Sequence, residues 1–270
     1  MIMILKRGSK GEDVKKLQKA LHITIDGDFG IKTEEAVKKF QKDNKLTVDG
    51  IVGTITWNML FKNESKTYQN LNDDSLKITK GYINVHISKL SNRPIKYIAI
   101  HYTAGGTSKP GTAMSTRNVF LKRNASADFV IDDETIVQIN PDLKNYYTWS
   151  VGDKKNPYSK GGQLYGKATN RNTISIEMCS SLMSGWQAKA ANHEGWYISD
   201  KVVNNTIKLV KYLMKKYNIP KSNVVRHYDI SGKLCPGVEG WNPDAMYDNN
   251  GKPINKKNNE YEWIKFKSKI

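Results

Sequence analysis

The stretch that decides the fold covers residues 97–102 and reads Tyr97-Ile98-Ala99-Ile100-His101-Tyr102. A short apolar run rich in isoleucine and tyrosine is typical of a buried β-strand. A second strand is predicted over Thr173-Ile174-Ser175-Ile176-Glu177-Met178. Because successive side chains of a strand point to opposite faces, its isoleucines and Met178 should face one way and Ser175 and Glu177 the other.

Further elements follow on both sides of these strands. Residues 128–131 and 135–139 are predicted to pair as a hairpin, and Val203, Ile207, Val210 and Met214 recur at helical spacing before Pro220. Residues 224–227 predict a short strand that leads into a glycine-containing loop. Strands alternating with helices indicate one α/β domain, which we place at residues 81–270. Six lysines follow residue 250, so we expect the C-terminal tail to form a solvated basic edge.

The first part of the chain contains an internal repeat. Residues 26–33 recur 23 residues later as residues 49–56, and both copies follow the pattern D-G-x-x-G-x-x-T. Each Asp-Gly predicts a turn, and each copy continues into a helix that we expect the threonine or a nearby hydroxyl to cap. Together with an earlier helix marked by Val14, Leu17 and Leu21, this pattern predicts a three-helix module over residues 1–62. Polar residues 63–80 are predicted to be a linker.

Composition and charge narrow the classes of protein. The chain has 270 residues, 38% of them hydrophobic, and a net charge of +17. Such a charge favours polyanionic partners: nucleic acid, anionic lipid or anionic cell-wall polymer. No apolar run approaches the length of a membrane span, and the first five apolar residues are too few for an export segment. The two cysteines allow at most one disulfide, and in a chain made in the cytoplasm we expect both thiols to be free.

Two histidines and one cysteine lie at predicted strand ends, where side chains converge on a site in α/β folds. His101 closes one strand, and His227 closes another before a loop that contains Cys235. Two imidazoles and one thiolate form a legitimate catalytic zinc set, because three protein ligands leave a fourth position open. Taken singly, each histidine is better explained as a satisfied core or edge residue, and spacing alone leaves the two interpretations of the set evenly balanced.

Glu177 and Lys233 are candidates for catalysis beside such a metal. Zinc-assisted hydrolysis needs a carboxylate that takes a proton from water and passes it to the leaving group, and Glu177 lies on the polar face of its strand. Lys233 precedes Cys235 by two residues and could place a cation against a developing oxyanion. Without a metal, Glu177 would be a surface carboxylate on an edge strand, and Lys233 would be one lysine among many.

These residues resemble the type-2 N-acetylmuramoyl-L-alanine amidases, a family of phage lysins, bacterial autolysins and peptidoglycan recognition proteins. The resemblance covers about residues 81–245 and rests on residues 98–104, 172–177 and 226–237. Residues 4–61 resemble the peptidoglycan-binding type 1 module, whose signature is the tandem D-G-x-x-G-x-x-T. The implied fold is a mixed central sheet flanked by helices, with zinc at the floor of a groove.

The resemblance implies a role for each candidate residue. It makes His101, His227 and Cys235 the zinc ligands, Glu177 the catalytic carboxylate and Lys233 the cation that stabilises the transition state. The bond cut would be the amide between N-acetylmuramic acid and the L-alanine of the stem peptide. Residue types alone indicate only metal-assisted hydrolysis of an amide or ester.

Two positions depart from patterns that many members share. A tyrosine used by some members is absent from Ser126-Ala127-Asp128-Phe129, so this chain should rely on Glu177. A W-H-x-G segment reads Trp149-Ser150-Val151-Gly152, without the histidine. We expect Trp149 and Tyr102 to contact substrate.

Other classes of function remain as alternatives. A catalytically inactive peptidoglycan-binding protein would carry the same modules, although retention of all three ligand positions argues against it. A nucleic-acid binder would explain the charge, but neither a zinc-finger spacing nor an RNA-binding motif is present. The expected partners are peptidoglycan and anionic wall polymers such as teichoic acids, without integral membrane association. Without a signal peptide, we expect a cytoplasmic product that reaches the cell wall through a holin or after lysis, as an endolysin or autolysin does.

Overall fold

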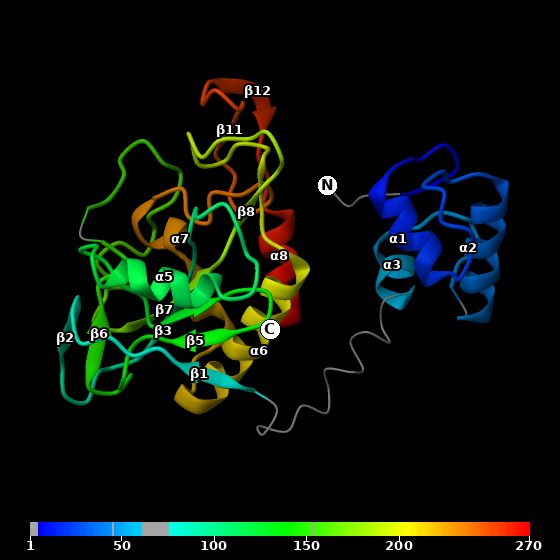
Figure 1. The fold of residues 1–270 in the computed structure, drawn as a ribbon. Helices are drawn as coiled ribbons and strands as arrows, with labels where there is room; N and C mark the ends of the chain where they lie inside the picture. Colours follow the sequence, from blue (N-terminus) through cyan, green and yellow to red (C-terminus); the bar gives the residue numbers. More distant parts are fainter. Residues whose placement is uncertain (1–4, 45, 61–75, 153) are drawn as a thin grey trace. The chain divides into compact units, whose positions relative to one another are not determined.

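The computed structural model describes residues 5–44, 46–60, 76–152 and 154–270. The chain divides into two compact units, residues 1–75 and 76–270, and each is described by itself (Figure 1). Most of the predicted linker, residues 63–80, lies outside the described residues. None of the helices in the described parts is long and apolar enough to cross a membrane.

The described residues of the first unit form the helices α1 (Glu12–Ala20), α2 (Ile31–Asp43) and α3 (Thr54–Leu60). Its small core gathers Val14 and Leu17 of α1, Val37 of α2, and Phe29 and Val52 from the repeat turns. The expected threonine cap of α2 is wrong, because the helix begins at Ile31 after Gly30 and no side chain caps it.

The repeat threonines instead belong to two matching hydrogen-bond networks, each built on a buried glutamine that sequence analysis missed. The Nε2 group of Gln41 donates to Asp49 Oδ1 (2.8 Å), Ile51 O (3.0 Å) and Thr56 Oγ1 (3.1 Å). Its Oε1 atom accepts from the amide of Gly50 at 2.9 Å. Gln18 makes the same four contacts in the first copy of the repeat. The repeat therefore encodes a buried amide that ties each helix to the turn after it.

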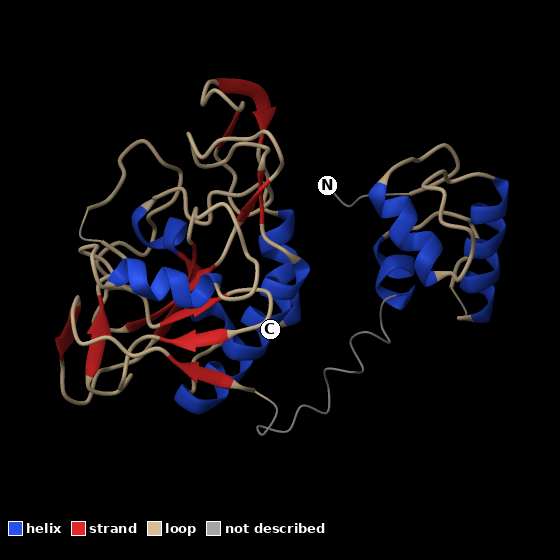
Figure 2. Cartoon of the chain, in the orientation of Figure 1, coloured by secondary structure: helices blue, strands red, loops and turns tan. Residues whose placement is uncertain are grey.

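A six-stranded mixed sheet forms the centre of the second unit (Figures 1 and 2). Its order is β1 (Ile78–Lys80), β5 (Ile136–Gln138), β4 (Phe129–Ile131), β7 (Thr173–Met178), β3 (Tyr97–Tyr102) and β10 (Val224–Arg226). β4 and β5 pair antiparallel as the predicted hairpin, whereas β4, β7, β3 and β10 are parallel neighbours. The predicted α/β class with a mixed sheet is confirmed. The strand predicted over 224–227 ends one residue early, because His227 begins a helix.

Helices cover both faces of this sheet. α6 (Asp200–Tyr217) and α8 (Tyr261–Lys269) contribute to the apolar cluster that also holds Ile174, Ile176 and Met178, so these three side chains share a face as predicted. α5 (Thr112–Phe120) contributes to a second cluster around Val130 and Val137. Ser175 and Glu177 of β7 alternate with the isoleucines and therefore point to the face opposite α6.

Short elements complete the second unit. They are α7 (His227–Ser231), the 3-10 helix η2 (Lys221–Asn223), and the antiparallel pairs β2 (Ile87–Lys89) with β6 (Tyr146–Thr148), β8 (Ser181–Leu182) with β9 (Trp196–Tyr197), and β11 (Ala245–Tyr247) with β12 (Pro253–Lys257).

The expectation of a solvated C-terminal tail is wrong for its last helix. Trp263 and Phe266 of α8 are buried in the main apolar cluster, whereas Lys265 and Lys269 of the same helix are exposed. Residues three apart on a helix share a face, so these two aromatic rings anchor α8 although lysine dominates the local composition. The C-terminal segment is therefore part of the folded domain.

Candidate metal centre

The fold brings the three predicted metal ligands together. His101 lies near the end of β3, which is flanked by β7 and β10, and His227 follows β10 directly as the first residue of α7. Cys235 lies in the loop after α7. The ligand atoms of these three buried residues all lie within 4.8 Å of one another, and the centroids of the two imidazole rings are 4.6 Å apart.

The two histidines each offer a ring nitrogen to a metal ion. Among the described residues, His101 Nε2 and His227 Nδ1 are buried without a hydrogen-bond partner. The other ring nitrogen of His227, Nε2, lies 3.0 Å from the carbonyl oxygen of Val151. Since a carbonyl can only accept, Nε2 carries the proton and Nδ1 keeps its lone pair. Sequence analysis missed this role of Val151, because a backbone carbonyl carries no residue-type signature.

Burial also sets the charge of the ligands. Desolvation lowers the pKa of His101 well below its usual value and that of His227 to about 4, so both rings are neutral near pH 7. It raises the pKa of the Cys235 thiol to about 12. A divalent cation would reverse this last effect, since a coordinated thiol loses its proton. Two neutral imidazoles and one thiol of this kind fit a zinc-type ion.

Glu177 lies beside these ligands. It occupies the position in β7 that pairs with His101 in β3, so the two side chains point to the same face of the sheet. Its Oε2 atom is buried and has no hydrogen-bond partner in the described part of the chain. Burial raises the pKa of Glu177 to about 8, against the opposing effects of Lys233 and Arg123. Glu177 is thus partly buried, and its Oε2 atom takes part in no structural hydrogen bond.

Two cations act on this group of residues. Lys233 contributes to the electrostatics of His101, His227, Cys235 and Glu177 alike, which places its ammonium group in the same neighbourhood. Arg123 comes from the segment after α5 and acts on Glu177. Arg123 was not among the predicted site residues, because an exposed arginine in a loop has no distinguishing pattern.

The two predicted substrate contacts have different surroundings. The ring of Tyr102 packs edge-on against Trp196, with centroids 5.7 Å apart, and burial raises the pKa of its hydroxyl group. The side chain of Trp149 is partly exposed, donates from Nε1 to Ser88 Oγ (2.9 Å) and lies 5.7 Å from the ring of His86. Substrate contact by Tyr102 and Trp149 stays a prediction.

The two cysteines do not form a disulfide. Both are free and buried, as predicted. Cys179 packs in the apolar cluster with Ala113 and Val130, which leaves Cys235 available as a ligand.

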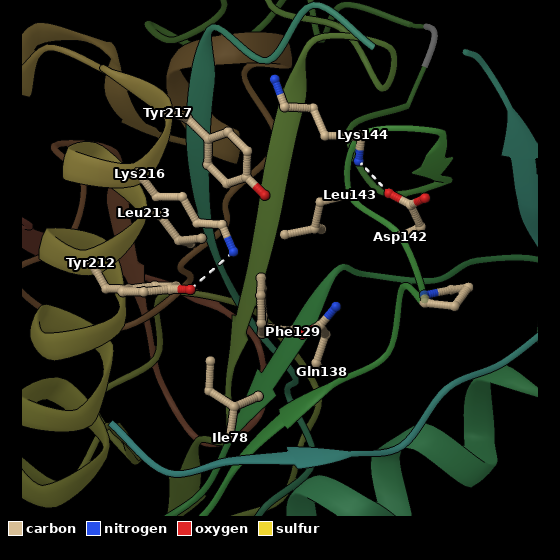
Figure 3. A pocket seen from close by; sticks show the side chains of 11 residues that line it. Ile78, Phe129, Gln138, Asp142, Leu143, Lys144, Tyr212, Leu213, Lys216 and Tyr217 are labelled. Carbon is tan, nitrogen blue, oxygen red and sulfur yellow. Dashed lines mark hydrogen bonds between the residues drawn. The ribbon is translucent and has the colours of Figure 1, made fainter. Parts of the chain in front are cut away.

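A separate recess of about 440 Å³ lies on the α6 side of the sheet (Figure 3). Its walls include Phe129 of β4, Leu213 of α6 and Leu143, and Lys216 Nζ donates to Tyr212 Oη at 2.9 Å across its rim. Because Glu177 points to the opposite face, this recess is not part of the metal centre.

The fold and the site define a class: an α/β protein with two buried histidines and one buried cysteine that could hold a metal ion, beside a partly buried glutamate. Residues 91–238, more than half of the chain, match the family model of N-acetylmuramoyl-L-alanine amidase. The chain belongs to this family. Residues 10–60 match the family model of a peptidoglycan binding domain.

Several known proteins are similar to part of this chain. The N-acetylmuramoyl-L-alanine amidase CwlL of Bacillus licheniformis is 29% identical over 172 residues, or 60% of this chain and 42% of that protein. CwlH of Bacillus subtilis is 32% identical over 150 residues, or 54% of this chain and 50% of that protein. The chain thus spans about half the length of these curated relatives. The solved catalytic domain of XlyA shares 28% identity, with a TM-score of 0.42 and coverage of 59% of this chain and 90% of that domain.

Proposed function

We propose that this protein is a zinc-dependent peptidoglycan hydrolase that cuts the amide between N-acetylmuramic acid and the L-alanine of the stem peptide. The observation that carries the proposal is the convergence of His101, His227 and Cys235 within 4.8 Å, in a chain of the amidase family. A catalytic zinc site needs three protein ligands and an open fourth position. The buried and unpartnered donor atoms of the two histidines support this assignment.

The chain's own residues divide the chemistry among them. Zinc, when bound, would act as a Lewis acid that lowers the pKa of water, so that a hydroxide nucleophile is available at neutral pH. Glu177 takes a proton from the attacking water as its oxygen bonds to the lactyl carbonyl carbon. The same carboxyl group then returns the proton to the L-alanine nitrogen as the C–N bond breaks. Lys233 stabilises the negative charge that develops on the carbonyl oxygen.

The first unit would hold the enzyme on its polymer. Its match to a peptidoglycan binding domain supports this role, and tethering raises the local concentration of substrate without any new catalytic contact. Residues 1–62 alone should co-sediment with purified cell walls. If they stay in the supernatant, the first unit is not an anchor. We further propose that the protein acts at the cell wall, where its net charge of +17 favours anionic wall polymers.

Mass spectrometry of the products tests the activity and identifies the bond. Purified Gram-positive peptidoglycan is incubated with the zinc-loaded protein and, as a control, with the protein after metal chelation. Free stem peptides that begin with L-alanine, beside glycan strands without peptides, are the expected products. Products cut at other bonds would still support a cell-wall hydrolase but would refute the proposed amidase activity. Co-sedimentation with the wall but no soluble product would favour the inactive binding protein.

A further inference from the structure

The C-terminal segment, residues 239–270, reaches the residue next to a metal ligand. The match to the amidase family ends at residue 238, so this segment lies outside the part that the family shares. Its helix α8 is anchored by Trp263 and Phe266 in the main apolar cluster. Glu260 directly precedes α8 and forms an ion pair with Arg226, which directly precedes His227.

Arg226 is a buried side chain whose donors are engaged on several sides. Its guanidinium group donates to Glu260 Oε1, to Asp229 Oδ1 and to the carbonyl oxygen of Trp241, each at 2.6 Å. The guanidinium carbon also lies 5.0 Å from the ring centroid of Trp263. The arginine side chain is only 6% exposed. Because a buried charge is strongly destabilised when it loses a partner, Arg226 depends on these carboxylates.

Hydrogen bonds of the same arginine also fix the backbone just before His227. Arg226 ends β10 and is the N-cap of α7, and its backbone amide donates to Asp229 Oδ2 at 2.8 Å. Its Nε atom donates to that oxygen at 3.0 Å. Asp229 therefore holds Arg226 by main chain and side chain together, and His227 lies between these two residues. The guanidinium group is therefore linked through Asp229 to the backbone at the start of α7.

We propose that Glu260 is a positioning residue of the metal centre, which acts through Arg226 to orient His227. The C-terminal segment is then a working part of the catalytic domain. This inference rests on the proposed zinc site. The physical reason is that the affinity of a site for its metal depends on the groups that orient the ligands. Loss of such a group typically lowers metal affinity about 10–100-fold. Glu260 acts one residue further away, so we expect the lower end of that range.

The test compares two variants of the full-length protein that remove the same charge near the same helix. Glu260→Gln removes one of the two negative charges that pair with Arg226 and keeps Asp229. Glu262→Gln is the matched control, because Glu262 pairs with Lys265 at 3.7 Å instead. Zinc affinity is measured by competition with a chromophoric chelator. The absorption bands of the Co²⁺-substituted protein report the geometry of the ligands, independently of activity.

Glu260→Gln should bind zinc about tenfold more weakly than the parent protein and shift the Co²⁺ bands, while Glu262→Gln matches the parent in both measurements. Parent-like affinity and bands in Glu260→Gln, or equal changes in both variants, would overturn the inference. If circular dichroism shows that Glu260→Gln does not fold, Glu260→Asp replaces it. That variant keeps the charge and should show a smaller shift in the same direction, and unchanged bands would overturn the inference. Failure of the parent protein to bind zinc would instead refute the proposed metal site.

Discussion

Glu177→Gln separates catalysis from folding and metal binding. Glutamine has nearly the shape of a protonated glutamate but cannot accept and return a proton. The Glu177 side chain is partly buried, and its Oε2 atom is buried without a hydrogen-bond partner in the described part of the chain. The variant should therefore fold and bind zinc as the parent protein does, and lose turnover.

The magnitude follows from the environment of the carboxyl group. General acid–base catalysis contributes about 10²–10⁴ in rate, so kcat should fall by that factor, which corresponds to about 3–5 kcal/mol. The metal-free protein should show a second effect. The pKa of Glu177 is raised from 4.5 to about 8 by burial, and each pKa unit corresponds to about 1.4 kcal/mol.

The sign of this second effect is fixed by linkage. A carboxyl group whose pKa is raised in the folded state favours folding when protonated, so its contribution is present below pH 4.5 and is lost as the pH rises toward 8. At pH 8 the metal-free parent therefore bears an ionisation cost of a few kcal/mol that glutamine does not. Metal-free Glu177→Gln should be more stable than the metal-free parent at pH 8, and the difference should vanish near pH 4.

Three measurements check these expectations. Release of peptides with a free L-alanine amine from peptidoglycan gives the rate, chelator competition gives the zinc affinity, and urea unfolding at pH 4 and pH 8 gives the stability of the metal-free forms. A variant that retains more than about a tenth of the parent rate would remove Glu177 from proton transfer, since that loss is far below the range for a general base. Equal stability of the metal-free parent and the metal-free variant at pH 8 would contradict the raised pKa of Glu177.

Three further predictions address the metal centre and the two units. Cys235→Ser should reduce bound zinc, measured by elemental analysis, from about one ion per chain to near zero, because two histidines alone fall short of a catalytic site; Cys179→Ala is the matched control and should keep its zinc. Gln41→Leu should destabilise the first unit by about 2 kcal/mol or more, since each buried group left without its partner costs about 1–3 kcal/mol; an unchanged calorimetric transition would contradict the role of its network. Burial lowers the pKa of Lys267 from 10.5 to about 8, so this residue favours folding at high pH and that contribution is lost as the pH falls from 10.5 through 8. The stability of the parent protein relative to Lys267→Met should therefore rise between pH 8 and pH 10 in urea titrations, and a constant difference would contradict the pKa shift.

The sequence errors have a common physical origin. The threonine cap of α2 and the solvated tail were both inferred from residue type, and in both cases a tertiary contact decided the outcome. The repeat threonine Thr56 serves the buried amide of Gln41 instead of a helix end. Trp263 and Phe266 are two apolar residues in a lysine-rich segment, and their effect depends on the cluster that receives them.

The sequence by itself determined most of the strands of the sheet and the face on which Glu177 lies. Alternation in residues 173–178 sends Glu177 away from the isoleucines, and local steric and solvation rules suffice for that inference. Only the tertiary structure decided which elements are neighbours: the order β7-β3-β10 places Glu177, His101 and His227 side by side. It also decided that the carbonyl oxygen of Val151 lies against the ring of His227 and that Glu260 reaches Arg226. Such contacts join residues far apart in the chain through sheet register and core packing, which no local pattern encodes.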